Sequence, residues 1–110
     1  MTDKIVVLTT CSSASEAEAL ARRVVGAGMA ACVSVIPQIR SFYRWKGEIE
    51  NAEEWQLVIK TSREKFDALR TLLETAHSYD LPELLALPII DGSPNYLAWL
   101  DNELKPADDA

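Results

Sequence analysis

The chain has 110 residues, of which 48% are hydrophobic, and this suits one domain with a substantial core. It carries 11 basic and 17 acidic residues, a net charge of −6, with no basic run, so nucleic acid is not an expected partner. The apolar run from Ile5 to Leu8 is far shorter than the roughly 18 residues of a membrane span. The N-terminus lacks the features of a signal peptide. We therefore expect a cytoplasmic protein, away from membranes, with reduced Cys11 and Cys32.

The first part of the chain predicts a buried strand and then a helix. Residues 4–10 include four consecutive apolar side chains, which is typical of a strand covered on both faces. Ser13 and Glu16 have the spacing of a capping box, in which each side chain satisfies a backbone N–H of the other residue. An apolar stripe over residues 17–25 continues the helix, and two glycines follow it.

The central stretch, residues 30–61, predicts two long strands joined by a tight turn at residues 45–48. Its first arm is far longer than the usual strand of about five or six residues. Pro37 has no N–H to give to a strand ladder, so it indicates an edge strand or a bulge. Beyond Pro37, one face of this arm carries Phe42 between two arginines. That face is either a half-solvated edge or a subunit interface, and the length of the hairpin calls for a partner.

A second helix and a fourth strand follow the hairpin. Residues 61–64 form another candidate capping box, and an apolar helical stripe over residues 66–76 leads to a helix end near His77. Residues 84–90 are almost continuously apolar and predict a strand. Pro88 within it favours an edge position.

The C-terminal part predicts a third helix and a tail. Ser93 suits the cap and Pro94 the first position of a short helix that reaches Leu104. Residues 106–110 are small and acidic, and we expect them to form a flexible tail. Residues 1–105 then make up the single domain.

The predicted order of elements is β-α-β-β-α-β-α. It corresponds to a ferredoxin-like α+β sandwich with a long hairpin between the second and third strands and an extra C-terminal helix. In this arrangement two helices cover one face of an antiparallel sheet, and the other face needs a different cover. The long hairpin and the open face are two independent reasons to predict a homo-oligomer.

His77 is the only histidine and the first candidate for metal binding. At the end of a helix it is either a cap favoured by the helix dipole or a ligand for copper or zinc. From the strand order we predict that His77 and Cys32 lie at the same end of the sheet and that Cys11 lies at the opposite end. Cys32 is then the possible partner of His77, with a small core residue as the alternative. Cys11 precedes a helix, so it is either a reactive thiol or an idle surface thiol.

No phosphate loop and no adjacent nucleophile and base are visible, so we expect a binding protein and not an enzyme. A ligand cleft that a neighbouring subunit closes is the second candidate site. For each aromatic residue the alternative is packing within an interface. The candidate cleft residues are Tyr43, Trp45, Lys60, Tyr79 and Glu83.

Several segments together match one known family. They are Thr9-Thr10-Cys11, Met29-Ala30-Ala31-Cys32-Val33-Ser34, the hairpin tip Ser41 to Ile49, Lys60-Thr61, His77 to Glu83, and Pro94 to Leu100. With these segments, the chain resembles the divalent-cation tolerance protein CutA family over about residues 4–104. The combination is highly specific, whereas no single segment would be.

The resemblance implies a cytoplasmic ferredoxin-like homotrimer, with the hairpin in the subunit contacts and a role in tolerance to copper (Cu²⁺) and other divalent cations. Members associated with copper carry a cysteine where this chain has Thr9 and paired histidines where it has Ala76-His77. By position the metal candidates are therefore His77 and Cys32, with Cys11 as a neighbour. The family is also similar to trimeric nitrogen-regulatory proteins. That similarity supports the alternative of a signalling protein that binds a small molecule or anion between subunits. A trimer that only scaffolds another protein is the third interpretation.

Overall fold

The computed structural model describes residues 1–105, and the predicted tail at 106–110 lies outside them. Four strands form one antiparallel sheet in the order β2-β3-β1-β4. This arrangement confirms the predicted ferredoxin-like α+β sandwich with a C-terminal helix. The elements in chain order are β1 (Lys4–Cys11), α1 (Ala14–Gly26), β2 (Cys32–Trp45), β3 (Glu48–Ser62), the 3-10 turn η1 (Arg63–Lys65), α2 (Phe66–Ala76), β4 (Leu85–Pro88) and α3 (Pro94–Leu104).

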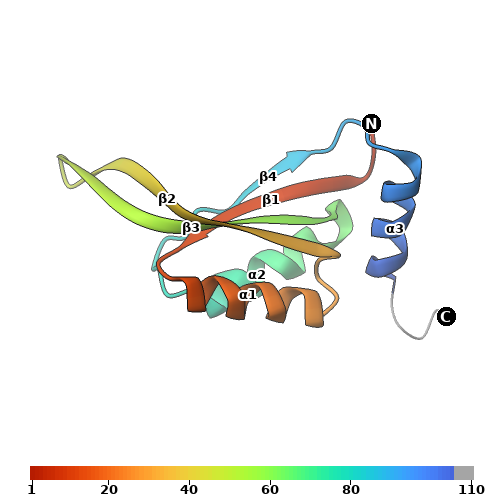
Figure 1. Cartoon of the computed structure of the whole chain (residues 1–110), viewed down its shortest axis with the longest axis horizontal. Coiled ribbons are helices and arrows are strands. Elements are labelled where there is room, and N and C mark those ends of the chain that lie inside the picture. The colour runs from red at the N-terminus through yellow and green to blue at the C-terminus, as the bar shows by residue number, and fades with distance from the viewer. Residues whose placement is uncertain (106–110) are drawn as a thin grey trace.

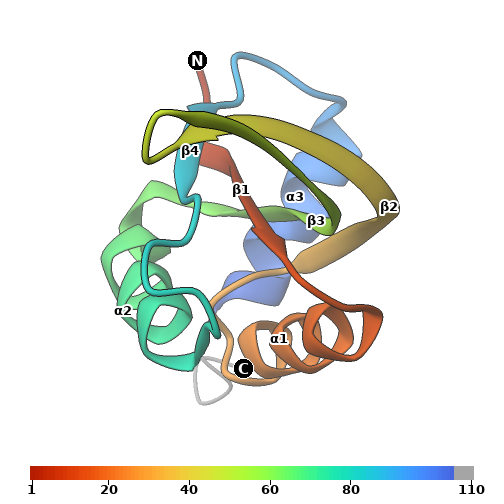
Figure 2. The ribbon, with the colours of Figure 1, turned by 90° about the vertical axis from the view of Figure 1, so that its left-hand side faces the viewer.

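The core lies between the sheet and the two helices α1 and α2, which cover the same face (Figure 2). Successive strand residues point to opposite faces, so alternate residues of β1 and β3 enter this core. Helix α3 lies at the end of the sheet where β1 begins (Figure 1), and Lys4 Nζ is 3.1 Å from Asp101 Oδ1 of that helix. The largest fully buried core side chains are Val7, Val24, Leu57, Ile59, Leu69 and Leu73.

The sheet face opposite α1 and α2, here called the open face, can be read from the strand register. Residues paired across antiparallel strands point to the same side. Val6 pairs with Lys60 and with Leu87, and Lys60 pairs with Cys32. Since Ile5 and Val7 face the helices, this row faces away from them. Cys32 and Lys60 therefore belong to the open face.

The helix starts differ in how well the sequence predicted them. Ser13 Oγ accepts the N–H of Glu16 at 3.1 Å, which is half of a capping box, but the Glu16 carboxylate turns to other donors. The predicted capping box at 61–64 is wrong. Thr61 is still part of β3, and its hydroxyl donates to the Met29 carbonyl at 2.7 Å. The turn η1 separates it from α2.

The hairpin of β2 and β3 extends well beyond the helices (Figure 1), and the molecule measures 50 × 26 × 22 Å. Its tip is a two-residue turn in which Lys46 and Gly47 both have positive φ, 51° and 82°, as a type I′ turn requires. The register shifts between Ile36 and Ile39, which confirms the break predicted at Pro37. β2 is an edge strand, and Pro37 has no partner in the ladder with β3, so its missing N–H is tolerated there.

β4 is shorter than the strand predicted over residues 84–90. It contains Leu85–Pro88, and all four residues are exposed. β4 forms the other edge of the sheet, as Pro88 indicated. Among residues 1–105, no helix has the length and apolar character needed to cross a membrane.

Candidate functional site

The site of interest is the end of the sheet where β1 finishes. β1 and β3 are antiparallel, with Lys4 opposite Ser62 and Cys11 opposite Trp55. β3 therefore ends where β1 begins, and α2 runs back to the end that carries Cys11. The prediction that His77 lies opposite Cys11 and beside Cys32 is wrong. It treated the ends of β1 and β3 as one edge, although these strands run in opposite directions.

His77 bridges two parts of this end. Its side chain is fully buried, and Nε2 lies 2.7 Å from the Thr10 carbonyl oxygen. A carbonyl only accepts, so Nε2 carries the proton. The Tyr79 N–H donates to Nδ1 at 3.1 Å. Both ring nitrogens are thus occupied, and a metal ion on His77 would replace one of these hydrogen bonds. The imidazole does not cap α2 either, because its partners lie outside the helix.

Cys11 directly follows Thr10, whose carbonyl oxygen contacts His77, but the Cys11 thiol is buried. The residue is fully buried, and Sγ is 3.7 Å from the Ser13 carbonyl oxygen. Burial, with the nearby Glu16 charge, raises the pKa of the Cys11 thiol to about 11. At neutral pH it is therefore a thiol and not a thiolate. The alternative of a surface thiol is wrong, because Cys11 is fully buried. For the alternative of a reactive thiol, burial opposes the thiolate that a helix N-terminus favours.

Glu16 organises the polar contacts of this end, and sequence reasoning missed that role. Its Oε1 accepts from Ser12 N–H and Ser12 Oγ, both at 3.2 Å, and from Ser78 Oγ at 3.0 Å. Its Oε2 accepts from Ser78 N–H at 2.9 Å. Burial by itself would raise the pKa of Glu16, but these donors outweigh it and the pKa is lowered. The capping-box spacing marked Glu16 but pointed to Ser13 as its partner.

After those of His77 and Glu16, the third polar contact at this end of the sheet joins Tyr79 and Glu54. The Tyr79 hydroxyl donates to Glu54 Oε2 at 2.7 Å. Glu54 is only 8% exposed, although its side chain is a carboxylate. Burial, and then the hydrogen bond to Glu54, raises the pKa of Tyr79. No spacing in the sequence marks Glu54, because its partner is 25 residues away along the chain.

Cys32 lies elsewhere, on the open face. Lys60 Nζ donates to Ser34 Oγ at 2.7 Å and is 3.9 Å from Cys32 Sγ. The three predicted metal ligands His77, Cys11 and Cys32 are therefore not brought together. Within residues 1–105, no group of three or more His, Cys, Asp or Glu side chains is arranged to hold a metal ion. A copper site made of these three residues does not fit a single subunit.

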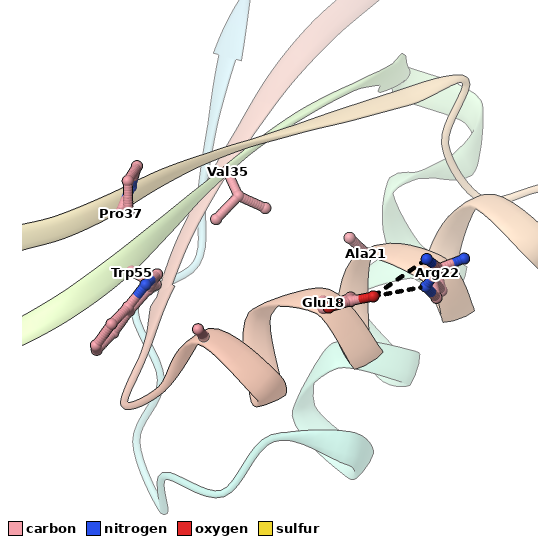
Figure 3. A pocket seen from close by; sticks show the side chains of 7 residues that line it. Glu18, Ala21, Arg22, Val35, Pro37 and Trp55 are labelled. Carbon is pink, nitrogen blue, oxygen red and sulfur yellow. Dashed lines mark hydrogen bonds and ion pairs between the residues drawn. The ribbon is translucent and has the colours of Figure 1, made fainter.

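The predicted cleft is not formed within one subunit either. Tyr43 and Trp45 lie near the exposed hairpin tip, whereas Lys60 pairs with Val6 near the other end of the sheet. Tyr79 belongs to the polar cluster of Glu16, and Glu83 is exposed before β4. An open hollow of about 520 Å³ lies between α1 and β2 (Figure 3). It is lined by other residues, among them Glu18, Arg22, Val35, Pro37 and Trp55.

The fold and this site define a class of protein: a small ferredoxin-like α+β domain with a protruding hairpin, an open sheet face and a buried polar cluster at the end of β1. The chain belongs to the family of the CutA1 divalent ion tolerance protein, whose profile matches residues 5–103. The family resemblance of the sequence motifs is thereby confirmed.

Individual relatives agree with this assignment. The divalent-cation tolerance protein CutA of Yersinia pestis (strain Pestoides F) is 42% identical over 100 residues, covering 91% of this chain and 84% of its own. The structure of CutA from Synechococcus elongatus is 45% identical, with a TM-score of 0.91 over 96% of this chain and 93% of that one. The periplasmic divalent cation tolerance protein CutA of Archaeoglobus fulgidus is 37% identical, with a TM-score of 0.90 over 93% of this chain and 99% of that one.

Proposed function

We propose that this protein acts in divalent-cation tolerance as a homotrimer and that copper is the cation to test first. The observation that carries the proposal is the family match over residues 5–103, together with relatives that are named for divalent-cation tolerance. The proposal also places the protein in the cytoplasm without an enzymatic activity. The Archaeoglobus relative is called periplasmic, so localisation needs its own test by fractionation.

Exposed apolar side chains support the assembly. Near the hairpin tip, Phe42, Trp45 and Ile49 are 68%, 54% and 72% exposed. On the open face, Leu87 is 45% exposed in the edge strand. Apolar surface of this kind marks contact sites on otherwise soluble domains. Both regions would be covered if copies of the chain packed their hairpins and sheets together.

The cation site of the proposal is shared between subunits, because one subunit offers no complete ligand set among its described residues. Cys32 lies on the open face and is the one of the three candidates that is partly exposed. Thiolate and imidazole suit copper and zinc. Cys11 and His77 are already committed to internal hydrogen bonds.

The test is calorimetric titration of the reduced, metal-free protein with Cu²⁺ under anaerobic conditions, with Zn²⁺ as a cation that does not oxidise thiols. We expect binding with a fixed stoichiometry per trimer, and its loss in Cys32→Ser. Cys11→Ser is the matched control, because that thiol is buried, and it should keep the binding. Weak heats that are the same in all three proteins would contradict a metal site at Cys32. Sedimentation equilibrium of the same samples tests the trimer.

A second candidate function is binding of an anion or small molecule between subunits. Its support is Lys60, which among the described residues makes hydrogen bonds only to Ser34 and Cys32. Its charge therefore has no carboxylate partner there. A thermal-shift screen of anionic metabolites would detect a ligand, because binding at 100 times the dissociation constant adds about 2.7 kcal/mol. Lys60→Met should abolish the shift, and a shift that persists would exclude this site.

A further inference from the structure

The segment after α2, residues 77–79, here called the strap, is fixed to three different elements. His77 Nε2 donates to the carbonyl of Thr10 in β1. Ser78 donates twice to Glu16 in α1, and the Tyr79 hydroxyl donates to Glu54 in β3. Figure 2 looks at this end of the molecule, where the segment between α2 and β4 passes in front of α2 on its way to β4. The strap therefore closes the end of the layer between the sheet and the helices.

Cys11 lies beneath this closure. The residue is fully buried, although it ends its strand and the next residue, Ser12, is exposed. Cys11 follows Thr10, whose carbonyl accepts the His77 hydrogen bond, and its thiol lies close enough to Tyr79 to contribute to the raised pKa of that hydroxyl. Cys11 is thus a member of the buried core cluster that lies at the end of β1, next to the point where the strap is attached.

Apart from the buried ring of His77, the strap and the residues that follow it have little apolar burial of their own. Ser78 and Asp80 are exposed, and Leu81 is 82% exposed. Segments held by polar contacts, with few buried apolar side chains, open at lower free energy than the core. What holds this strap is mainly hydrogen bonding to carboxylates, which is stronger than bonding between neutral groups. Glu16 accepts two such bonds from Ser78 of the strap, and two further bonds from Ser12 hold the carboxylate in place.

We propose that the strap is a gate over Cys11 that opens without unfolding of the domain, and that the Glu16 carboxylate holds it closed. The titratable groups around Glu16 are His77, whose Nδ1 is 3.9 Å from Oε2, and Cys11 and Tyr79, whose pKa values the Glu16 charge helps to raise. Glu54 of β3 acts on the same two groups. Loss of the Glu16 charge leaves the two Ser78 donors with a weaker acceptor. The opened gate exposes a thiol that the closed form hides. This inference does not depend on the proposed function.

The experiment measures the rate at which a neutral disulfide reagent labels Cys11 in a Cys32→Ser protein at pH 7. Urea is varied below the unfolding transition. A local opening exposes little surface, so its free energy depends weakly on urea, whereas global unfolding depends steeply on it. We expect a labelling rate that is nearly constant at low urea. Adding Glu16→Gln should raise that rate at least tenfold.

The matched control is Glu18→Gln, which makes the same change on the same helix at an exposed side chain that pairs with Arg22. It should leave the rate unchanged. If Glu16→Gln does not fold, Ser78→Ala removes one hydroxyl donor from an exposed residue and should accelerate labelling severalfold. The gate is excluded if labelling rises with urea in step with global unfolding. It is also excluded if Glu16→Gln, or Ser78→Ala in its place, labels no faster than Glu18→Gln.

Discussion

The two halves of the β2–β3 hairpin share one strand geometry but lie in opposite environments. Near the base, Leu57 and Ile59 are fully buried under α1 and α2, whereas beyond the bulge Phe42 and Ile49 are more than two-thirds exposed. Strand pairing continues through both halves. Hydrogen bonding therefore holds the strands together along the whole hairpin, but apolar burial stabilises only the base. The outer half has apolar side chains available for another molecule.

The largest expected effect is at the base of the hairpin. Leu57→Ala removes a fully buried side chain and leaves a cavity, which typically costs about 3 kcal/mol of unfolding free energy. Ile49→Ala, in the outer half, should change the unfolding free energy of the dissociated chain by less than about 0.5 kcal/mol. Urea denaturation of both variants at low protein concentration gives the comparison. Equal losses of unfolding free energy in the two variants would mean that the outer half of the hairpin is already buried within one subunit.

The role of the outer half of the hairpin is tested by measuring the association of subunits. Phe42→Asp places a charge on a side chain that is 68% exposed in one subunit. If that side chain is buried between subunits, about 1.5–3 kcal/mol of apolar burial is lost and a charge is left unpaired. The trimer should then dissociate at least tenfold more readily in sedimentation equilibrium. The control is Ala19→Asp, on the exposed side of α1, which should leave the assembly intact. Identical sedimentation of both variants would contradict a hairpin interface.

Local features of this fold could be predicted from the sequence. The bulge at Pro37 follows from a missing N–H, the end of α2 before His77 follows from the Tyr79-Asp80 pair and a nearby proline, and the tight turn follows from Gly47. Each of these depends on residues within a few positions of one another, so a short window contains the whole cause.

The polar cluster could not be predicted in this way. Placing His77 beside Cys11 requires the direction of β3 relative to β1, which is a property of the sheet. The burial of Cys11 and the bonding of Glu16 to Ser78 are contacts between residues far apart in the chain. The capping-box pattern marked Glu16, but the tertiary contact replaced the local one. The site prediction failed because it placed the end of β3 at the same edge of the sheet as the end of β1.

A smaller effect concerns a polar atom within the covered part of the sheet. Thr9 is fully buried, and its Oγ1 has no hydrogen-bond partner among residues 1–105. Thr9→Val removes the unsatisfied hydroxyl at nearly the same volume and should raise the unfolding free energy by about 1 kcal/mol. Thr61→Val is the matched control, because that buried hydroxyl donates to the Met29 carbonyl. It should lower stability, as thermal unfolding will show, and a stabilising Thr61→Val would undermine this reasoning.

The last expected effect is the pH dependence of the stability that the Glu16 carboxylate gives to the end of the sheet under the strap. The pKa of Glu16 is lowered in the folded protein from its ordinary value of 4.5. The unfolded chain therefore binds the proton more tightly, so the stabilisation from Glu16 is complete above about that pH and is lost as the pH falls through the lower, folded pKa. The stability difference between the parent and Glu16→Gln should be largest at pH 7 and should shrink below pH 4.5. Because Ser78 supplies half of the donors to this carboxylate, Ser78→Ala should reduce the same pH-dependent difference. Urea unfolding at a series of pH values measures it. A difference that stays constant down to pH 3 would mean that Glu16 acts through packing and not through its charge, and the hold on the strap would then not be electrostatic.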